Sequence, residues 1–304
     1  MDRSAARLRN ALLWVLCTYG LVHVLYYIGS EGSWLTLHDS LGFTAGPPFN
    51  HRVLFVLVAR AFRLLRPTLH DPAVYFLSQI VAAGAAMWMI ESWARRFVSE
   101  PVAAWSRPLL LVLLVPTFTY WTFYDIAIVF FFTAALYCLV TGRWALYLLV
   151  FALGILNHDN MVLIVPIALA IRYRTWRIGF AGVAWAAAQI ALYVAIRWSL
   201  FHILPAHAAW QSGKLAYNLG LLHHPTMLMK TVVWLTGWGL IAWTARRRLP
   251  REILIGSLLL PAILLVSIPV GQLNELRLFN PALPVLVVAI LIAMSPTPAD
   301  ARTH

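Results

Sequence analysis

The chain is dominated by apolar runs that are long enough to cross a lipid bilayer. An α-helix rises about 1.5 Å per residue, so about 20 apolar residues span the hydrocarbon core of a membrane. Of the 304 residues, 62% are hydrophobic and 11% are charged, whereas a soluble domain carries about 25% charged residues. The sequence therefore predicts an all-α, polytopic membrane protein.

The apolar runs divide into ten expected membrane spans. Two runs of roughly 30 residues are too long for one crossing, and each fits two short ones. The turns within these pairs would fall at "TFTYWTFYD" (117–125) and "NHDN" (157–160). The ten expected spans are 11–29, 73–94, 106–121, 125–142, 144–157, 160–173, 178–200, 228–245, 252–270 and 279–295.

The segment "HRVLFVLVARAFRLLRP" (51–67) differs from the spans because arginines recur along it. On a helical wheel, Arg52, Arg60, Arg63 and Arg66 fall within about 120°, and the remaining face is apolar. This pattern predicts an amphipathic helix that lies in the membrane interface, within the first outer loop. A short transmembrane helix is the alternative.

The distribution of arginines gives the expected orientation. With ten spans, most arginines collect on one side of the membrane, and such enrichment marks the cytoplasmic side. The net charge of +12 then follows from topology, and we expect no nucleic acid as a partner. The chain is predicted to be a multi-pass protein of the cell inner (plasma) membrane with both termini cytoplasmic. It would form a single domain, 1–304, with long outer loops at 30–71 and 201–227 and no soluble domain.

Acidic residues collect on the opposite, outer side. Under this topology, Asp39, Asp71, Asp125, Asp159 and Glu275 all fall in outer loops or turns. A charge at mid-membrane is costly, whereas a carboxylate at the outer end of a span can reach water or a polar cavity. The outer arginines suit the phosphate of a lipid-linked donor, and a carboxylate suits an acceptor hydroxyl as its general base. Any chemistry is therefore expected at the outer face.

Five segments carry a family resemblance. "LHDS" has an acid soon after the first span, and "PPFNHRVL" has a proline, an aromatic residue and an arginine. "FYDIAIVFFFTAALYCLVTGR" begins with an acid at an outer turn, and "ALGILNHDNMVLIVPIALA" is a short helix pair with a polar turn. "NELRLFNPALPVLVV" combines an acid, an arginine and prolines. In this order, the segments resemble the GT-C superfamily of integral-membrane glycosyltransferases, over roughly 11–295 and most closely over 30–172.

The resemblance implies a function and roles for residues. A sugar would pass from a polyprenyl-phosphate donor to an acceptor hydroxyl on the outer, periplasmic face, with Asp39 as the base. Acids in the outer turns would position the sugar, the acceptor or an ion, and arginines would hold the donor phosphate. The expected substrate-binding residues are Asp125, Asp159, His158, Glu275, Arg277, Arg52 and His38. The expected partners are the polyprenyl-phosphate-linked sugar, membrane lipids, and a glycan, lipid or protein acceptor.

Three features depart from the family pattern. Many members have paired acids in the first outer loop, whereas Asp39 has only His38 beside it. The chain is short for the superfamily, and it has no C-terminal soluble domain to hold a large acceptor. These departures disfavour an oligosaccharyltransferase and leave the substrate open.

Each of these signals also has a structural explanation. An acid can cap a helix or form a turn, Glu275 and Arg277 can form a surface ion pair, and the arginines of 51–67 can bind anionic headgroups. No cofactor is expected. The acids are compatible with a divalent cation, but no local ligand spacing predicts a metal site.

Two other functions stay open. One is a polymerase or ligase of lipid-linked glycans, which would use the arginines and histidines of the outer loops. The other is a non-enzymatic transporter or flippase, which would place polar groups at mid-membrane. The spans of this chain are nearly free of charge, so interfacial chemistry is favoured.

Overall fold

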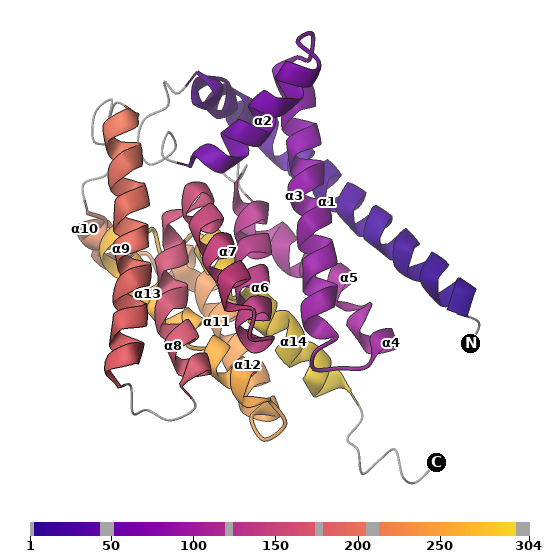
Figure 1. Cartoon of the computed structure of the whole chain (residues 1–304), viewed down its shortest axis with the longest axis vertical. Coiled ribbons are helices and arrows are strands. Elements are labelled where there is room, and N and C mark those ends of the chain that lie inside the picture. The colour runs from indigo at the N-terminus through magenta and orange to yellow at the C-terminus, as the bar shows by residue number, and fades with distance from the viewer. Residues whose placement is uncertain (1–2, 43–51, 119–123, 174–178, 205–212, 296–304) are drawn as a thin grey trace.

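The computed structural model describes residues 3–42, 52–118, 124–173, 179–204 and 213–295. Within these ranges all regular structure is helical. Figure 1 places α2 at one end of the bundle and α4 and α12 at the opposite end. The "PPFN" part of the first outer loop, most of the turn 117–125 and part of the loop 201–227 lie outside the described residues. The all-α prediction is confirmed for the part of the chain that is described.

The first half of the chain forms the helices around the candidate site. They are α1 (Arg3–Leu41), α2 (Val53–Leu65), α3 (Asp71–Ala94), α4 (Glu100–Ala103), α5 (Ser106–Leu114), η2 (Val115–Thr117), α6 (Asp125–Val140) and α7 (Trp144–Asn157). The second half follows with η3 (Asp159–Leu163), α8 (Ile164–Arg172), α9 (Phe180–Ile203), α10 (Leu215–Leu221), α11 (Pro225–Ala245), α12 (Arg251–Gly256), α13 (Leu259–Val270), η4 (Leu276–Ala282) and α14 (Leu283–Met294).

Five helical segments in the described ranges are long and apolar enough to cross a membrane. They are Arg7–Ile28, Asp71–Ala94, Phe180–Ile203, Arg251–Val270 and Leu276–Met294. These five agree with predicted spans, and several apolar helices of this kind fit a multi-pass membrane protein. The other five predicted spans coincide with α5, α6, α7, α8 and α11. The first four are short, and α11 carries Lys230 and three tryptophans that lower its mean hydropathy. The count of ten spans therefore remains a prediction.

The first helix is longer than the sequence indicates. We expected a span at 11–29 followed by an outer loop, but α1 continues to Leu41. An isolated glycine costs a helix only about 1 kcal/mol, so Gly29 and Gly32 do not end it. The helix terminates at Gly42, whose N–H donates to the carbonyl of His38 at 3.2 Å. The segment that carries His38 and Asp39 is consequently helical.

A helix is present where 51–67 predicted one, as α2, whereas its place in the membrane interface remains a prediction. Its inner face is buried through Val53, Phe55, Val56 and Ala59. Its other face exposes leucines, among them Leu64. The inner face packs against α1, α3 and α7, which brings the residue before α2 close to the ends of other helices.

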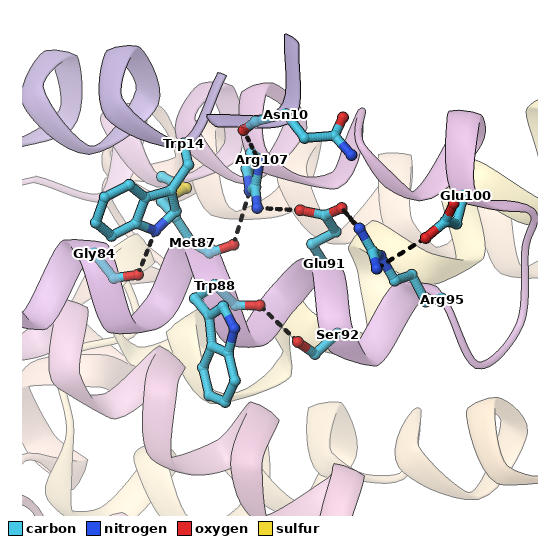
Figure 2. Close-up of polar contacts among 10 residues, drawn as sticks. All are labelled: Asn10, Trp14, Gly84, Met87, Trp88, Glu91, Ser92, Arg95, Glu100 and Arg107. Carbon is cyan, nitrogen blue, oxygen red and sulfur yellow. Dashed lines mark hydrogen bonds and ion pairs between the residues drawn. The ribbon is translucent and has the colours of Figure 1, made fainter. Parts of the chain in front are cut away.

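At the opposite end of the bundle, α1, α3 and α5 are joined by a buried charge network (Figure 2). Glu91 is 2% exposed and forms ion pairs with Arg107 and, at 2.6 Å, with Arg95. Arg107 also donates to the backbone carbonyls of Met87 and Asn10. Arg95 reaches the exposed Glu100 at 3.0 Å. A charged residue thus lies inside the predicted span 73–94, where the sequence pattern indicated only an apolar helix.

Candidate functional site

Six of the eight residues predicted from the sequence converge in the structure. They belong to elements far apart in the chain: the residue before α2, the start of α6, the turn between α7 and η3, and the start of η4. We call this group, together with one tyrosine, the outer cluster, after the side of the membrane on which the sequence predicts it. Its members are Arg52, Tyr124, Asp125, His158, Asp159, Glu275 and Arg277.

Arg52 links three parts of the cluster. It directly precedes α2, whose buried inner face holds it against the bundle, and it is 8% exposed. Its guanidinium carbon lies 4.1 Å from the centre of the Tyr124 ring, a cation–π geometry. Its terminal nitrogen is 3.5 Å from Oδ1 of Asp159. A cation of the first outer loop is therefore fixed against the turns of α6 and η3.

Arg277 approaches from η4. Its Nε donates to Oε2 of Glu275 at 2.8 Å, and one terminal nitrogen lies 3.4 Å from the hydroxyl of Tyr124. The ring of Tyr124 thus has one guanidinium over its face and another at its hydroxyl. Two cations that are 225 residues apart in sequence (277 − 52) meet at one buried aromatic side chain.

Asp125 lies between these cations and is 2% exposed. It is the first residue of α6, where the helix dipole favours a negative charge. Arg277 and Arg52 are the cationic groups that act on it electrostatically. Its Oδ2 is buried and accepts no hydrogen bond from the described residues. Buried polar atoms nearly always have a partner, so this oxygen is available to a ligand or to water.

Asn157 supports Asp125 from α7. Its Nδ2 donates to the carbonyl of Tyr124 at 3.3 Å, which ties the end of α7 to the start of α6. Its own Oδ1 is buried and has no partner among the described residues. A second buried acceptor therefore belongs to the same pair of helix ends as Asp125.

His158 and Asp159 form a coupled pair in the turn that follows α7. Nδ1 of His158 lies 2.8 Å from Oδ1 of Asp159 and 3.1 Å from the backbone N–H of Asn160. Burial, and then the positive charge of Arg52, lower the pKa of His158 to about 4, so the ring is neutral at pH 7. Burial alone would raise the pKa of Asp159, but His158 and Arg52 lower it well below its usual range. Nδ1 accepts the backbone N–H of Asn160, so in the neutral ring this nitrogen has no proton to give to Asp159, and the cation beside the carboxylate is Arg52.

The low pKa of His158 predicts a dependence of stability on pH. Between about 6.5, the pKa in an unfolded chain, and about 4, the unfolded state binds a proton that the folded state does not. The contribution of His158 to stability should therefore fall as the pH drops through this window, by up to about 1.4 kcal/mol per pH unit. Asp125, whose pKa burial raises to about 6, contributes in the opposite direction below that pH. Thermal unfolding in detergent from pH 7.5 to 4.5 measures the sum, and His158→Gln should lose less stability on acidification than wild type. His223→Gln, at an exposed site, should not; equal profiles for all three proteins would refute the assignment.

His38 and Asp39 belong to a different group of side chains. Both are exposed near the end of α1, and Nδ1 of His38 lies 2.9 Å from Oδ2 of Asp71, which also pairs with Arg63. Arg52 directly precedes α2 and Arg63 lies in its last turn. A rise of 1.5 Å per residue places their backbones roughly 16 Å apart. The catalytic role of Asp39 thus remains a prediction, and its neighbour His38 lies toward the Arg63 end of α2 rather than the Arg52 end.

The remaining arginines of α2 are engaged at that second group. Arg60 donates to the carbonyl of Leu41 at 3.0 Å. Together with Arg63, Leu41, Leu64 and Pro67 it lines an open pocket of about 560 Å³. Of the arginine stripe, Arg52 is therefore the member that the structure places in the outer cluster.

Two residues of this site, Tyr124 and Asn157, are not among the residues predicted from the sequence. Asn157 belongs to the predicted polar turn 157–160. Their position next to an acid, in "YD" and "NHD", was the available signal. Within the described residues there is no group of three or more His, Cys, Asp or Glu side chains that could hold a metal ion.

Comparisons with family models, with curated proteins and with solved structures find no match for this chain.

Proposed function

We propose that the chain is a membrane glycosyltransferase of the GT-C type, which transfers a sugar from a polyprenyl-phosphate donor to an acceptor hydroxyl at the outer cluster. The observation that carries this proposal is Asp125, a buried carboxylate that has an unpartnered oxygen and two guanidinium neighbours. Guanidinium groups bind phosphate strongly through charge-assisted hydrogen bonds. A carboxylate beside them can take the proton of a hydroxyl.

The proposed step uses these groups in fixed roles. Arg52 and Arg277 hold the donor phosphate, exchanging part of their contacts with Asp159 and Glu275. The carboxylate accepts the proton of the acceptor hydroxyl, whose oxygen attacks the anomeric carbon of the sugar. The bond between that carbon and the phosphate oxygen breaks, and polyprenyl phosphate leaves with its electron pair, so no general acid is needed.

Two carboxylates compete for the role of base. The family resemblance gives Asp39, whereas the outer cluster contains Asp125. We place the base at Asp125, because a donor held by Arg52 and Arg277 would meet this carboxylate first. His158, neutral at pH 7, and Asp159 would keep Arg52 in position.

The membrane orientation forms part of the proposal. The outer cluster would face the periplasm, with both termini in the cytoplasm and a glycan, lipid or protein as acceptor. Arginines stack on aromatic rings where the sequence predicts the cytoplasmic ends of helices: Arg172 lies 4.9 Å from the Trp144 ring, and Arg246 lies 3.7 Å from the Trp243 ring. Paired arginine and tryptophan side chains suit a membrane interface.

Donor binding by the purified protein tests the proposal. Wild type should bind a synthetic polyprenyl-phosphate sugar and release sugar to an acceptor. Arg277→Gln should weaken binding by about 10-fold to 100-fold, because a hydrogen bond to a charged group contributes roughly 1.5–3 kcal/mol. Arg66→Gln is the matched control, since this exposed arginine at the end of α2 attracts anionic lipid without belonging to the cluster. Equal binding by the two variants, or no binding by wild type, would overturn the proposal.

A further inference from the structure

One side chain outside the outer cluster makes four hydrogen bonds to a single stretch of backbone. Asn218 lies on α10, in the second outer loop, and is 4% exposed. Its Nδ2 lies 3.2, 2.8 and 2.8 Å from the carbonyl oxygens of Ser267, Ile268 and Gly271, and its two N–H groups serve these three acceptors with one bond shared. Its Oδ1 accepts from the backbone N–H of Leu273 at 3.1 Å.

The geometry of α13 explains why this backbone needs outside partners. The last four carbonyls of a helix have no partner within it, and α13 ends at Val270 with Pro269 in its last turn. The carbonyl of Pro269 accepts from the backbone N–H of Lys214 at 2.7 Å, and Asn218 binds the two carbonyls before it. The start of α10 therefore caps the end of α13.

The capped segment leads directly into the outer cluster. Leu273 is held at both backbone groups, because Thr231 of α11 donates to its carbonyl at 2.8 Å while Asn218 accepts from its N–H. Glu275 follows two residues later and Arg277 four residues later. Beyond them, Phe279 stacks on Trp234 with ring centres 5.3 Å apart. Contacts with α10 and α11 thus hold the backbone that leads into η4.

We propose that Asn218 is a positioning residue for Arg277, so that the second outer loop sets the place of one of the two cations. It would act on the donor only through the backbone 267–273. The expected effect of Asn218 on donor binding rests on the proposed function. Its expected effect on the stability of the backbone 271–278 does not. The chain offers a matched control in Asn274, a half-buried asparagine of the same segment whose Nδ2 donates to the side-chain hydroxyl of Tyr217 and not, among the described residues, to backbone.

Two measurements on the full-length protein in detergent test this role. The first is hydrogen exchange of the amides of 271–278. Asn218→Ala should speed their exchange by about 10-fold or more, the effect of losing a hydrogen-bond network of about 1.4 kcal/mol. Asn274→Ala should leave it unchanged, and α3 should exchange as in wild type in both variants. Unchanged exchange in 271–278, or an equal increase throughout the chain, would overturn the proposal, since the second result means a general loss of stability.

The second measurement is binding of a polyprenyl-phosphate sugar in a double-mutant cycle. Asn218→Ala should weaken binding by about 10-fold in wild type and have little further effect in the Arg277→Gln background, because residues that act through one another are non-additive. Additive losses would show that Asn218 does not act through Arg277. If wild type binds no such lipid, the proposed function fails. The exchange data then still decide whether Asn218 holds the segment of Arg277.

Discussion

Replacing Asp125 by Asn is expected to lower sugar transfer by at least about 100-fold while donor binding persists. A general base contributes roughly 10²–10⁴-fold to rate, and the amide keeps the shape of the side chain but cannot take a proton. The measurement is the initial rate of transfer from a synthetic polyprenyl-phosphate sugar, with donor affinity and the unfolding temperature recorded for the same preparations. Retained affinity with lost turnover identifies a base rather than a structural residue.

The control for this prediction is Asp39→Asn. Asp39 is exposed near the end of α1, beside His38, which pairs with Asp71 as Arg63 does, and its replacement should change the rate by less than about 10-fold. The reverse pattern, with transfer lost in Asp39→Asn and kept in Asp125→Asn, would assign the base to Asp39. It would also mean that the end of α1 approaches the outer cluster when substrate binds.

The largest loss of stability is expected for Glu91→Gln. Glu91 is the buried anion between Arg107 and Arg95 (Figure 2). Its neutralisation leaves the charge of Arg107 buried without its ion-pair partner. Removing one partner of a buried pair costs about 3–5 kcal/mol. Thermal unfolding in detergent should therefore show a clear drop in the unfolding temperature.

Glu100→Gln provides the comparison, because Glu100 pairs with the same Arg95 but its side chain is 72% exposed. An exposed ion pair contributes about 0–1 kcal/mol, so this variant should unfold near the wild-type temperature. The double variant Glu91→Gln, Arg107→Gln should recover part of the loss, since it removes both buried charges. Equal unfolding temperatures for Glu91→Gln and Glu100→Gln would contradict the prediction.

Hydropathy was sufficient to predict the helices, because apolar runs of this length have few other stable arrangements. It could not fix how many of them cross a membrane. Helices such as α6, with 16 residues, and α7, with 14, have the composition of spans but not the usual length. It also missed Glu91, because a single charge near the end of a span barely changes the hydropathy of a 24-residue helix.

The outer cluster was predictable in part because the expected topology puts acids at helix ends on one surface. In the structure Asp125, Asp159 and Glu275 each lie at the start of a helix or directly before one, and the packing of α2, α6, α7 and η4 brings these ends together. The same reasoning predicted that Asp39 lies in a loop, but α1 continues past the predicted boundary and makes this residue helical. The role of Asn218 left no signal in the sequence, since its partners are backbone carbonyls about 50 residues away and backbone groups are the same in every residue.

The order of synthesis, from the N-terminus to the C-terminus, determines when the cluster is complete. A ribosome adds roughly 5–20 residues per second, so Arg52 emerges tens of seconds before Arg277 does. Until η4 is synthesised, Asp125 has one of its two guanidinium neighbours, and the ring of Tyr124 has a cation over its face but none at its hydroxyl. The outer cluster is therefore completed only when η4 has been made, and a chain that stops before residue 275 would carry most of the described helices but lack Glu275 and Arg277.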